Sequence, residues 1–251
     1  MPDQIPGTAN TQVLEFCLLG GIELRGAPDG VSDQLLAQSK TVALLAFLVL
    51  SPDGRFQRRD RLVALLWPEL DQAHARAALR KALFVARGSL GPDVITSRGD
   101  DELAIAPDRL RCDVLEFEGA CERGRLSRAL EIYRGDFMPG FFLPGCLEYE
   151  RWVEEQRTAA RERAAAASWA LAQTFEAEHQ LSNAGSWARR TVRHAWDDER
   201  VLRRAVTMLD RLGDRAGAVK LYEDFAARLR ADLDIEPSAE TVTLVNAIRS
   251  R

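Results

Sequence analysis

The sequence lacks the residues that metal sites and disulfide frameworks need. Its 251 residues include only four cysteines and three histidines. The cysteines are Cys17, Cys112, Cys121 and Cys146, and no two of them have the CxxC spacing of a zinc site or a redox pair. We therefore expect buried free thiols, with no metal ion and no bound cofactor.

Long hydrophobic runs and catalytic motifs are missing too. The longest apolar run lies within Thr41 to Leu50, well short of the roughly 20 residues that cross a bilayer. Residues 1–12 lack the charged and apolar regions of a signal peptide, and we expect them to be disordered. No GxxxxGK[ST], HExxH or GxSxG motif occurs. These absences predict a cytoplasmic protein that does not contact a membrane and is not an enzyme.

Positive charge is in the minority overall but is concentrated in one segment. The chain has 34 Lys and Arg against 38 Asp and Glu, a formal net charge of -4. Residues 55–98 hold nine basic residues against four acidic ones, a local balance of +5. Such an asymmetry is expected when one segment meets a polyanion and the remainder does not.

Residues 13–106 have the pattern of a small α/β module. Apolar residues around Gly20 and Gly21 predict two short strands within residues 13–25. Three helices are then expected: over residues 40–50, from about residue 58 to Pro68, and over residues 73–91. The runs "VITS" and "ELAIA" around the turn "RGDD" predict a β-hairpin. This order is that of a winged helix-turn-helix.

From residue 113 onward the pattern is almost purely helical, with an irregular repeat. A glycine, an alanine and a tyrosine recur at one spacing, as Gly124, Ala129 and Tyr133 and as Gly213, Ala218 and Tyr222. Ala184 stands 34 positions before Ala218, which is the tetratricopeptide period. The predicted fold is therefore mainly α, with a winged helix-turn-helix over residues 13–111 and a tetratricopeptide-like helical domain over residues 112–251.

The helix expected over residues 73–91, "AHARAALRKALFVARGSLG", combines an apolar face with an acid-free basic face. The outer face carries Arg76, Arg80, Lys81, Phe84 and Arg87. A solvated helix face usually mixes both signs because Glu–Lys pairs stabilise it. Arginine suits bidentate contacts with guanine or a grip on phosphate. An exposed Phe84 would suit a thymine methyl or a sugar, whereas a half-buried Phe84 would pack against the hairpin.

Further cations stand near the expected helix starts. Lys40, Arg58 and Arg59 lie close to helix N-termini, where backbone N–H groups and the helix dipole favour phosphate. Each of them is also compatible with an ordinary charged residue that makes no such contact.

Three segments together resemble a known family. "SKTVALLAFLVLSPDGRFQRRDRLVALLWPELDQAHARAALRKALFVARGSLG" resembles the OmpR-type winged helix of SARP-like (antibiotic regulatory protein) activators. "DVLEFEGACERGRLSRALEIYRGDFMPGFFLPGCLEYERWVEEQR" and "LGDRAGAVKLYEDFAARLRADLDIEPSAET" resemble the bacterial transcriptional activation domain that follows it. The resemblance covers nearly the whole chain from Val13.

The resemblance implies a sequence-specific transcriptional activator. Members of the family bind direct repeats in double-stranded promoter DNA, often as side-by-side protomers, and recruit RNA polymerase. It implies that Arg76, Arg80 and Lys81 contact bases and nearby phosphates and that Arg87 contacts the DNA backbone. Arg98, in the hairpin, would reach the minor groove or its phosphates. Trp67 would donate its indole N–H to a phosphate, or else serve as a core aromatic.

The sequence departs from the family at the end of the recognition helix. Val85 and Gly88 stand where relatives have basic residues, and Gly88 weakens the last turn by up to about 1 kcal/mol. Modest DNA affinity or an early helix end would follow.

Two other functions are compatible with the helical half alone. One is a protein-interaction scaffold, which would leave the basic segment unexplained. The other is a ligand-sensing adaptor, in which Trp152, Trp169, Trp187 and Trp196 line a groove; aromatics at helical spacing are more often core residues.

Overall fold

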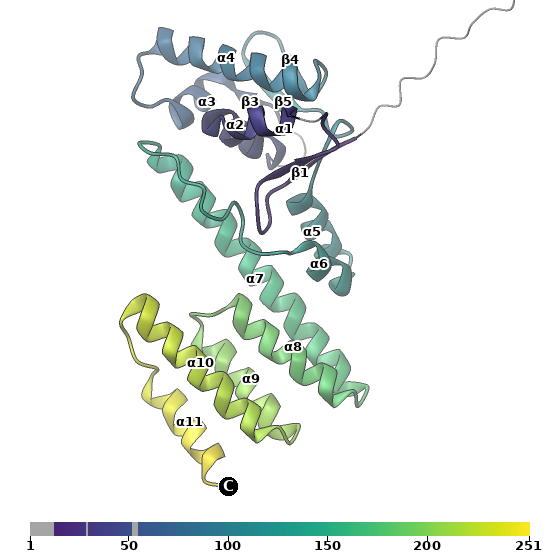
Figure 1. Cartoon of the computed structure of the whole chain (residues 1–251), viewed down its shortest axis with the longest axis vertical. Coiled ribbons are helices and arrows are strands. Elements are labelled where there is room, and N and C mark those ends of the chain that lie inside the picture. Colours follow the sequence, from purple (N-terminus) through teal and green to yellow (C-terminus); the bar gives the residue numbers. More distant parts are fainter. Residues whose placement is uncertain (1–12, 29, 52–54) are drawn as a thin grey trace, which may run out of the picture. The chain divides into compact units, whose positions relative to one another are not determined.

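The computed structural model describes residues 13–28, 30–51 and 55–251, which fold into two compact units. One unit comprises residues 1–116 and 137–154, and the other comprises residues 117–136 and 155–251. The expected disorder of residues 1–12 lies outside the described residues. Figure 1 shows the elements of both units.

The described residues of the first unit up to residue 112 contain four helices between short strands, not the three expected. Its strands are β1 (Leu14–Cys17), β2 (Glu23–Arg25), β3 (Gln57–Arg58), β4 (Ile95–Arg98), β5 (Glu102–Ile105) and β6 (Leu110–Cys112). Its helices are α1 (Val31–Leu36), α2 (Ser39–Val49), α3 (Arg59–Leu66) and α4 (Gln72–Leu90). The sequence pattern missed α1 because six residues with a single buried side chain, Leu35, show no helical period.

Two three-stranded sheets complete the winged helix-turn-helix. In one sheet β1 pairs antiparallel with β2 and parallel with β6, so that Phe16 lies opposite both Leu24 and Cys112. In the other, the order is β3-β5-β4 and all pairs are antiparallel. The strands β4 and β5 form the predicted hairpin, which is the wing.

The core of this unit explains its most apolar stretch. In α2 every residue from Thr41 to Val49 is buried. α2 packs on α1, α3, α4 and β5, so it is covered on all sides. This is why the sequence shows a continuous apolar run there and not one apolar stripe.

Residues 137–154 belong to the same unit although the twenty residues 117–136, which separate them from residue 116, belong to the other. The backbone N–H of Met138 donates to the carbonyl oxygen of Leu18 at 2.7 Å, and Leu19 forms an isolated bridge with Phe137. Asp113 accepts hydrogen bonds from the backbone N–H groups of Leu18 at 2.8 Å and Leu19 at 3.0 Å. The end of β1 therefore anchors two later segments.

All four cysteines are free thiols. Cys17, Cys112 and Cys146 are buried as expected, whereas Cys121 is only half-buried. Burial raises the pKa of the Cys112 thiol well above its usual range, and the nearby Asp113 raises it further. Cys146 donates a hydrogen bond to the carbonyl oxygen of Leu66 at 3.3 Å. The described residues include no cluster of His, Cys, Asp or Glu side chains that could hold a metal ion.

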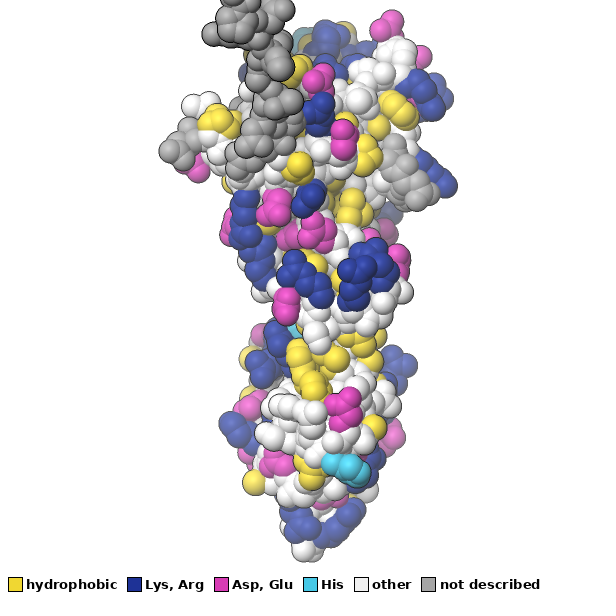
Figure 2. All heavy atoms as spheres, turned by 90° about the vertical axis from the view of Figure 1, so that its right-hand side faces the viewer, with side chains coloured by type: hydrophobic (Ala, Val, Ile, Leu, Met, Phe, Trp, Pro, Cys, Tyr) yellow, Lys and Arg dark blue, Asp and Glu magenta, His cyan; other side chains and the backbone are white. Residues whose placement is uncertain are grey.

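Charged side chains of both signs are interspersed on the surface seen in Figure 2. Many of them form exposed ion pairs, which individually add little stability. None of the helices in the described part of the chain has the length and apolar character to cross a membrane.

The second unit consists of helices. They are α6 (Leu126–Ile132), α8 (Leu181–His194), α9 (Glu199–Arg211), α10 (Arg215–Leu233) and α11 (Ala239–Arg249), together with most of α5 (Asp113–Glu122) and of α7 (Leu147–Ala177). α9 packs against α8, α10 and α11. The tetratricopeptide-like interpretation is confirmed in its key positions, since Ala129, Ala184 and Ala218 are all fully buried.

A left-handed residue precedes each of these three alanines by five positions. Gly124 has φ 69°, His179 has φ 58° and Gly213 has φ 84°. Around each of them, the same pair of backbone hydrogen bonds closes the preceding helix. The repeat is therefore present three times, and the sequence pattern showed it only partly because His179 replaces glycine in one copy.

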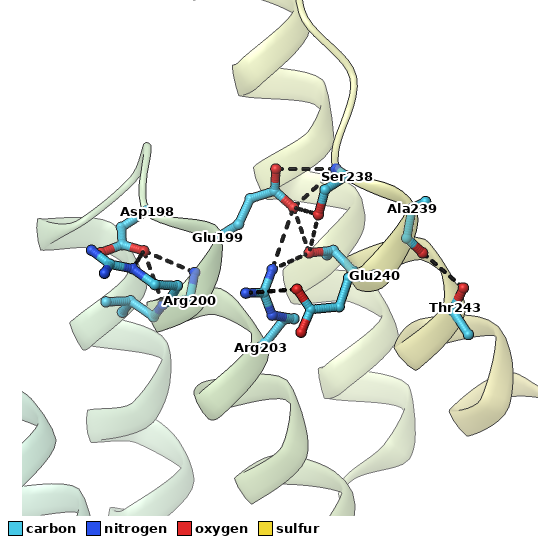
Figure 3. A network of polar contacts seen from close by, with 10 residues as sticks. Asp198, Glu199, Arg200, Arg203, Ser238, Ala239, Glu240 and Thr243 are labelled. Atoms are coloured by element: carbon cyan, nitrogen blue, oxygen red, sulfur yellow. Dashed lines mark hydrogen bonds and ion pairs between the residues drawn. The ribbon is translucent and has the colours of Figure 1, made fainter.

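A polar network fixes the start of the last helix, α11, against α9 (Figure 3). The carboxylate of Glu199 accepts hydrogen bonds from the backbone N–H of Ser238 at 3.0 Å, from its hydroxyl at 2.6 Å and from the hydroxyl of Thr241. Arg203 bridges Thr241 at 2.9 Å and Glu240 at 3.1 Å. Burial works to raise the pKa of Glu199, but the Ser238 and Thr241 hydrogen bonds outweigh it and the pKa lies below its usual value.

Candidate nucleic-acid interface

The helix α4 presents the predicted basic surface. Its buried side consists of Ala75, Leu79, Ala82, Leu83 and Ala86, which recur at intervals of four, three, one and three residues. The opposite side is exposed and contains no acidic residue between Ala73 and Gly91. Gly88 does not end the helix early, because α4 continues to Leu90 and closes at Gly91.

Arg80, Lys81 and Phe84 form the most available part of this surface, and we call them the α4 stripe. All three side chains are exposed. Arg80 and Lys81 have no ion pair or hydrogen bond to any residue that the structure describes. Phe84 is 79% exposed, so the half-buried alternative is wrong. The α4 stripe therefore offers two cations that have no ion-pair partner among the described residues, beside an exposed aromatic ring.

Arg76 lies one turn before the stripe and is already paired. Its guanidinium donates to Asp60 of α3 at 2.9 Å, and both side chains are about half exposed. An exposed pair of this kind is weak and can exchange its partner for a phosphate. Arg76 can thus contribute to an interface by exchanging Asp60 for a phosphate, or through the N–H groups that do not contact Asp60.

The N-terminus of α4 is occupied by its own cap. The carboxylate of Asp71 accepts hydrogen bonds from the backbone N–H groups of Ala73 at 3.0 Å and His74 at 3.1 Å. The hydrogen bond from the His74 side chain is the main reason that the pKa of Asp71 is lowered. A negative charge at this end repels phosphate, so an approaching backbone is favoured further along the helix.

Arg87 and Arg98 hold the wing. Arg87 donates to the carbonyl oxygen of Ile95 at 3.1 Å and to the Ser97 hydroxyl at 3.3 Å, which joins α4 to β4. Arg98 pairs with Glu102 at 2.5 Å, a hydrogen bond that raises the pKa of the guanidinium and lowers that of the carboxyl. Arg98 nevertheless remains 65% exposed, whereas Arg87 is half-buried.

The other predicted phosphate contacts divide between surface and interior. Arg58 is exposed at the start of α3. Arg59 is half-buried, and its Nε has no hydrogen-bond partner among the described residues. Lys40 turns inward, donating to the carbonyl oxygen of Leu66 and lying 3.1 Å from the Cys146 sulfur. Trp67 is only 6% exposed, which favours the core alternative over a phosphate contact.

The four tryptophans that the sequence offered for a groove do not share one. Trp152 packs edge-on against Phe47 in the first unit, with ring centroids 5.2 Å apart. In the second unit an arginine stacks over each ring: Arg204 over Trp169, Arg190 over Trp187 and Arg228 over Trp196. Trp196 lines two neighbouring pockets of the described residues, and none of the other three tryptophans is among the lining residues of either.

Comparison with known proteins places the chain beside regulatory proteins. A family model described as the bacterial transcriptional activator domain matches residues 113–249. The chain is similar to the solved structure "Mycobacterium tuberculosis EmbR in complex with low affinity phosphopeptide", with a TM-score of 0.59 and 22% sequence identity over 94% of this chain. It spans 65% of that chain's length, and the similarity supports the fold. No curated protein matched the sequence.

Proposed function

This chain belongs to the bacterial transcriptional activator domain family, as a SARP-like transcriptional regulator, and we propose that it activates transcription by binding promoter DNA through α4. The family model covers more than half of the chain, and the family consists of transcription regulators and not of enzymes. Promoter binding is also consistent with the cytoplasmic location that the sequence predicts.

The observation that carries the proposal is the α4 stripe. Arg80 and Lys81 project from a helix whose other side is locked into the core, so their position is set by the fold and not by partner side chains. Phe84, exposed one turn further on, offers an apolar contact beside them. An unpaired pair of cations on a rigid helix next to a β-hairpin is the arrangement with which winged helices enter a major groove.

We assign a role to each of the other predicted site residues from its exposure and from the contacts that it already makes within the protein. Arg58 and Arg98 are exposed and suited to phosphate contacts on either side of the groove. Lys40 and Trp67 serve the interior, and Arg87 supports the wing. We therefore propose that Arg80 and Lys81 read bases or adjacent phosphates and that Arg76 joins them after leaving Asp60.

The test is selection of bound sites from random DNA followed by footprinting with variants. Arg80→Ala should lower affinity for the selected site by about 1–3 kcal/mol and relax the preference at one base position. Arg58→Ala should weaken all DNA about equally. Arg128→Ala, which removes an exposed arginine of α6, is the matched control and should bind normally. If Arg80→Ala gives the same footprint and the same base preference as the unmodified chain, α4 is not the helix that recognises the DNA sequence.

We further propose that protomers bind side by side on direct repeats and recruit RNA polymerase. The selected sites should contain two copies of one half-site in the same orientation. In transcription reconstituted from purified components, the protein should raise output from a promoter with that site, and Arg80→Ala should not.

The alternative is an interaction scaffold or adaptor that binds DNA weakly or not at all. It is supported by the helical unit, whose repeats resemble protein-binding arrays. Failure to enrich any site from random DNA would favour the scaffold.

A further inference from the structure

We propose that the second unit contains a binding pocket for a small phosphorylated metabolite, lined by arginines from four separate segments. The pocket has a volume of about 390 Å³, within the roughly 300–1,000 Å³ typical of ligand sites. Its arginines are Arg134, Arg161, Arg190, Arg193 and Arg228, and its other lining residues are Tyr133, Gly135, Asp136, His194 and Trp196. This site is distinct from the α4 stripe and does not depend on DNA binding.

The charge of the pocket is strongly one-sided. The lining holds five arginines and one carboxylate, Asp136, which accepts two hydrogen bonds of 2.9 Å from Arg161. Arg228 pairs with Asp232, which is not part of the lining, at 3.2 Å. Arg190 and Arg193 are exposed and have no carboxylate partner among the described residues. Arginine forks match phosphate oxygens in geometry and charge. A ligand with two or more negative charges would therefore replace water as their partner.

The dipoles of the helices do not by themselves explain why these arginines cluster in one pocket. Arg190 and Arg193 lie in the last turns of α8, where a cation is favoured by the helix dipole. Arg134 lies just past the end of α6, where the dipole also favours a cation, but Arg161 lies in the middle of α7 and Arg228 lies within α10, so a helix end explains neither of these two. The fold brings them to one place from across the unit.

His194 lines the pocket together with Arg190 and Arg193. Burial lowers its pKa to about 4, and Arg190 and Arg193 contribute to that shift. Its ring packs edge-on against Tyr133, with centroids 5.1 Å apart, and its Nε2 has no hydrogen-bond partner in the described part of the chain. The Nε2 atom is itself buried, so His194 contributes a buried, unpartnered polar atom to the pocket wall.

The adjoining pocket sets the limits of the site. It shares Arg161 and His194, but its further lining includes Glu162, Asp197, Asp198 and Glu199. Arg200 also lines the adjoining pocket and pairs with Asp198 at 3.1 Å, but carboxylates still outnumber cations there. An anion is therefore favoured in the arginine-lined pocket. Trp196 and Tyr133 supply an aromatic wall in that pocket, which suits a phosphate ester with an organic part over a bare anion.

Calorimetric titration of the full chain with pyrophosphate, inorganic sulfate, AMP and a sugar phosphate tests the proposal. Pyrophosphate and the phosphate esters should bind at a single site, and sulfate much more weakly. The double variant Arg190→Gln/Arg193→Gln should lose about tenfold or more in pyrophosphate affinity. Both side chains are exposed, so this variant should fold, which circular dichroism will check. Arg228→Gln provides a second test at a different wall of the pocket.

Two controls separate this site from general electrostatics and from DNA binding. Arg128→Gln, outside the pocket, and Arg80→Ala, on the α4 stripe, should each bind pyrophosphate within about twofold of the unmodified chain. The proposal is overturned if no phosphate compound binds at millimolar concentration, if the double variant binds normally, or if either control weakens binding as much as the double variant does.

Discussion

Substitution of Phe84 distinguishes an effect on protein stability from an effect on DNA binding. Its ring is 79% exposed on α4, so it contributes little to the core. Phe84→Ala should change the free energy of unfolding by no more than about 0.5 kcal/mol and still weaken binding to the selected DNA site severalfold. Urea unfolding and a binding titration measure the two quantities.

The matched control for that substitution is Phe142, which is 66% exposed in the first unit and lies outside α4. Phe142→Ala should leave both stability and DNA affinity unchanged. Equal DNA affinity in Phe84→Ala and the unmodified chain would show that the ring takes no part in the interface.

His194 makes the stability of the protein depend on pH. Its pKa falls from the ordinary 6.5 to about 4 because the ring is largely buried and because the nearby charges of Arg190 and Arg193 disfavour its protonation, with Asp136 partly opposing the shift. Between these two pH values the unfolded chain binds a proton that the folded chain does not. The stability present above pH 6.5 is therefore lost progressively as the pH falls toward 4.

We expect His194→Gln to remove this part of the pH dependence. At pH 5 the loss attributable to His194 should be about 1–2 kcal/mol relative to pH 7, after allowance for partial solvent screening. Urea unfolding at both pH values gives the comparison. Parallel pH profiles for the variant and the unmodified chain would contradict the burial of a neutral imidazole.

At the scale of the element, the three helix ends before Ala129, Ala184 and Ala218 form a natural substitution series. Gly213 has φ 84° and open space where a Cβ would stand, so Gly213→Ala tests backbone strain without a steric clash. It should destabilise the protein by about 1 kcal/mol. His179 adopts the same conformation at φ 58°, and His179→Gly should stabilise it by about 0.5 kcal/mol.

Thermal and urea unfolding measure both effects. The comparison substitution is Gly88→Ala in α4, where the backbone is helical and the site is also open. It should stabilise the helix by up to about 1 kcal/mol, because alanine is the better helix former. A stabilising Gly213→Ala would mean that the left-handed conformation is not needed at that turn.

The elements that the sequence predicted well are those with a local signal. The period of α4, the proline after α3 and the polar turn of the wing are each contained within a few residues, and all three elements lie where expected. The strand β6 was missed because its three residues are defined by parallel pairing with β1, nearly a hundred positions away. Short elements with distant partners leave almost no pattern of their own.

The sequence predicted that the candidate site is a basic helix face, but it identified only some of the residues that the face makes available. The acid-free face of α4 is visible in the sequence, and Arg80, Lys81 and Phe84 are exposed as that face requires. Nothing in the sequence reveals that Lys40 turns inward to the Leu66 carbonyl or that Arg87 braces the wing. The arginine pocket was missed for the same reason, since its members are spread over nearly a hundred residues.

At the scale of the whole molecule, the chain has a net negative charge and is nevertheless proposed to bind DNA, which is a polyanion. The dependence of DNA affinity on salt concentration tests this proposal. Contact with about four phosphates would reduce affinity for the selected site by about 100-fold between 50 and 200 mM salt. Arg58→Ala should reduce the slope of log affinity against log salt by about one unit. A flat response would favour the scaffold function, because attraction by the +5 segment could then not account for binding.

The division of the chain between its two units has a consequence for its synthesis. Residues 117–136 belong to the second unit but precede residues 137–154, which belong to the first. Domains on a ribosome usually fold in the order in which they emerge. Here the core of the N-terminal unit is still incomplete when the winged helix has left the ribosome. The buried side chains of Phe137, Met138 and Tyr149 belong to that core and are translated later. A stalled nascent chain ending near residue 116 should therefore remain sensitive to protease, and one extended beyond Glu154 should become resistant.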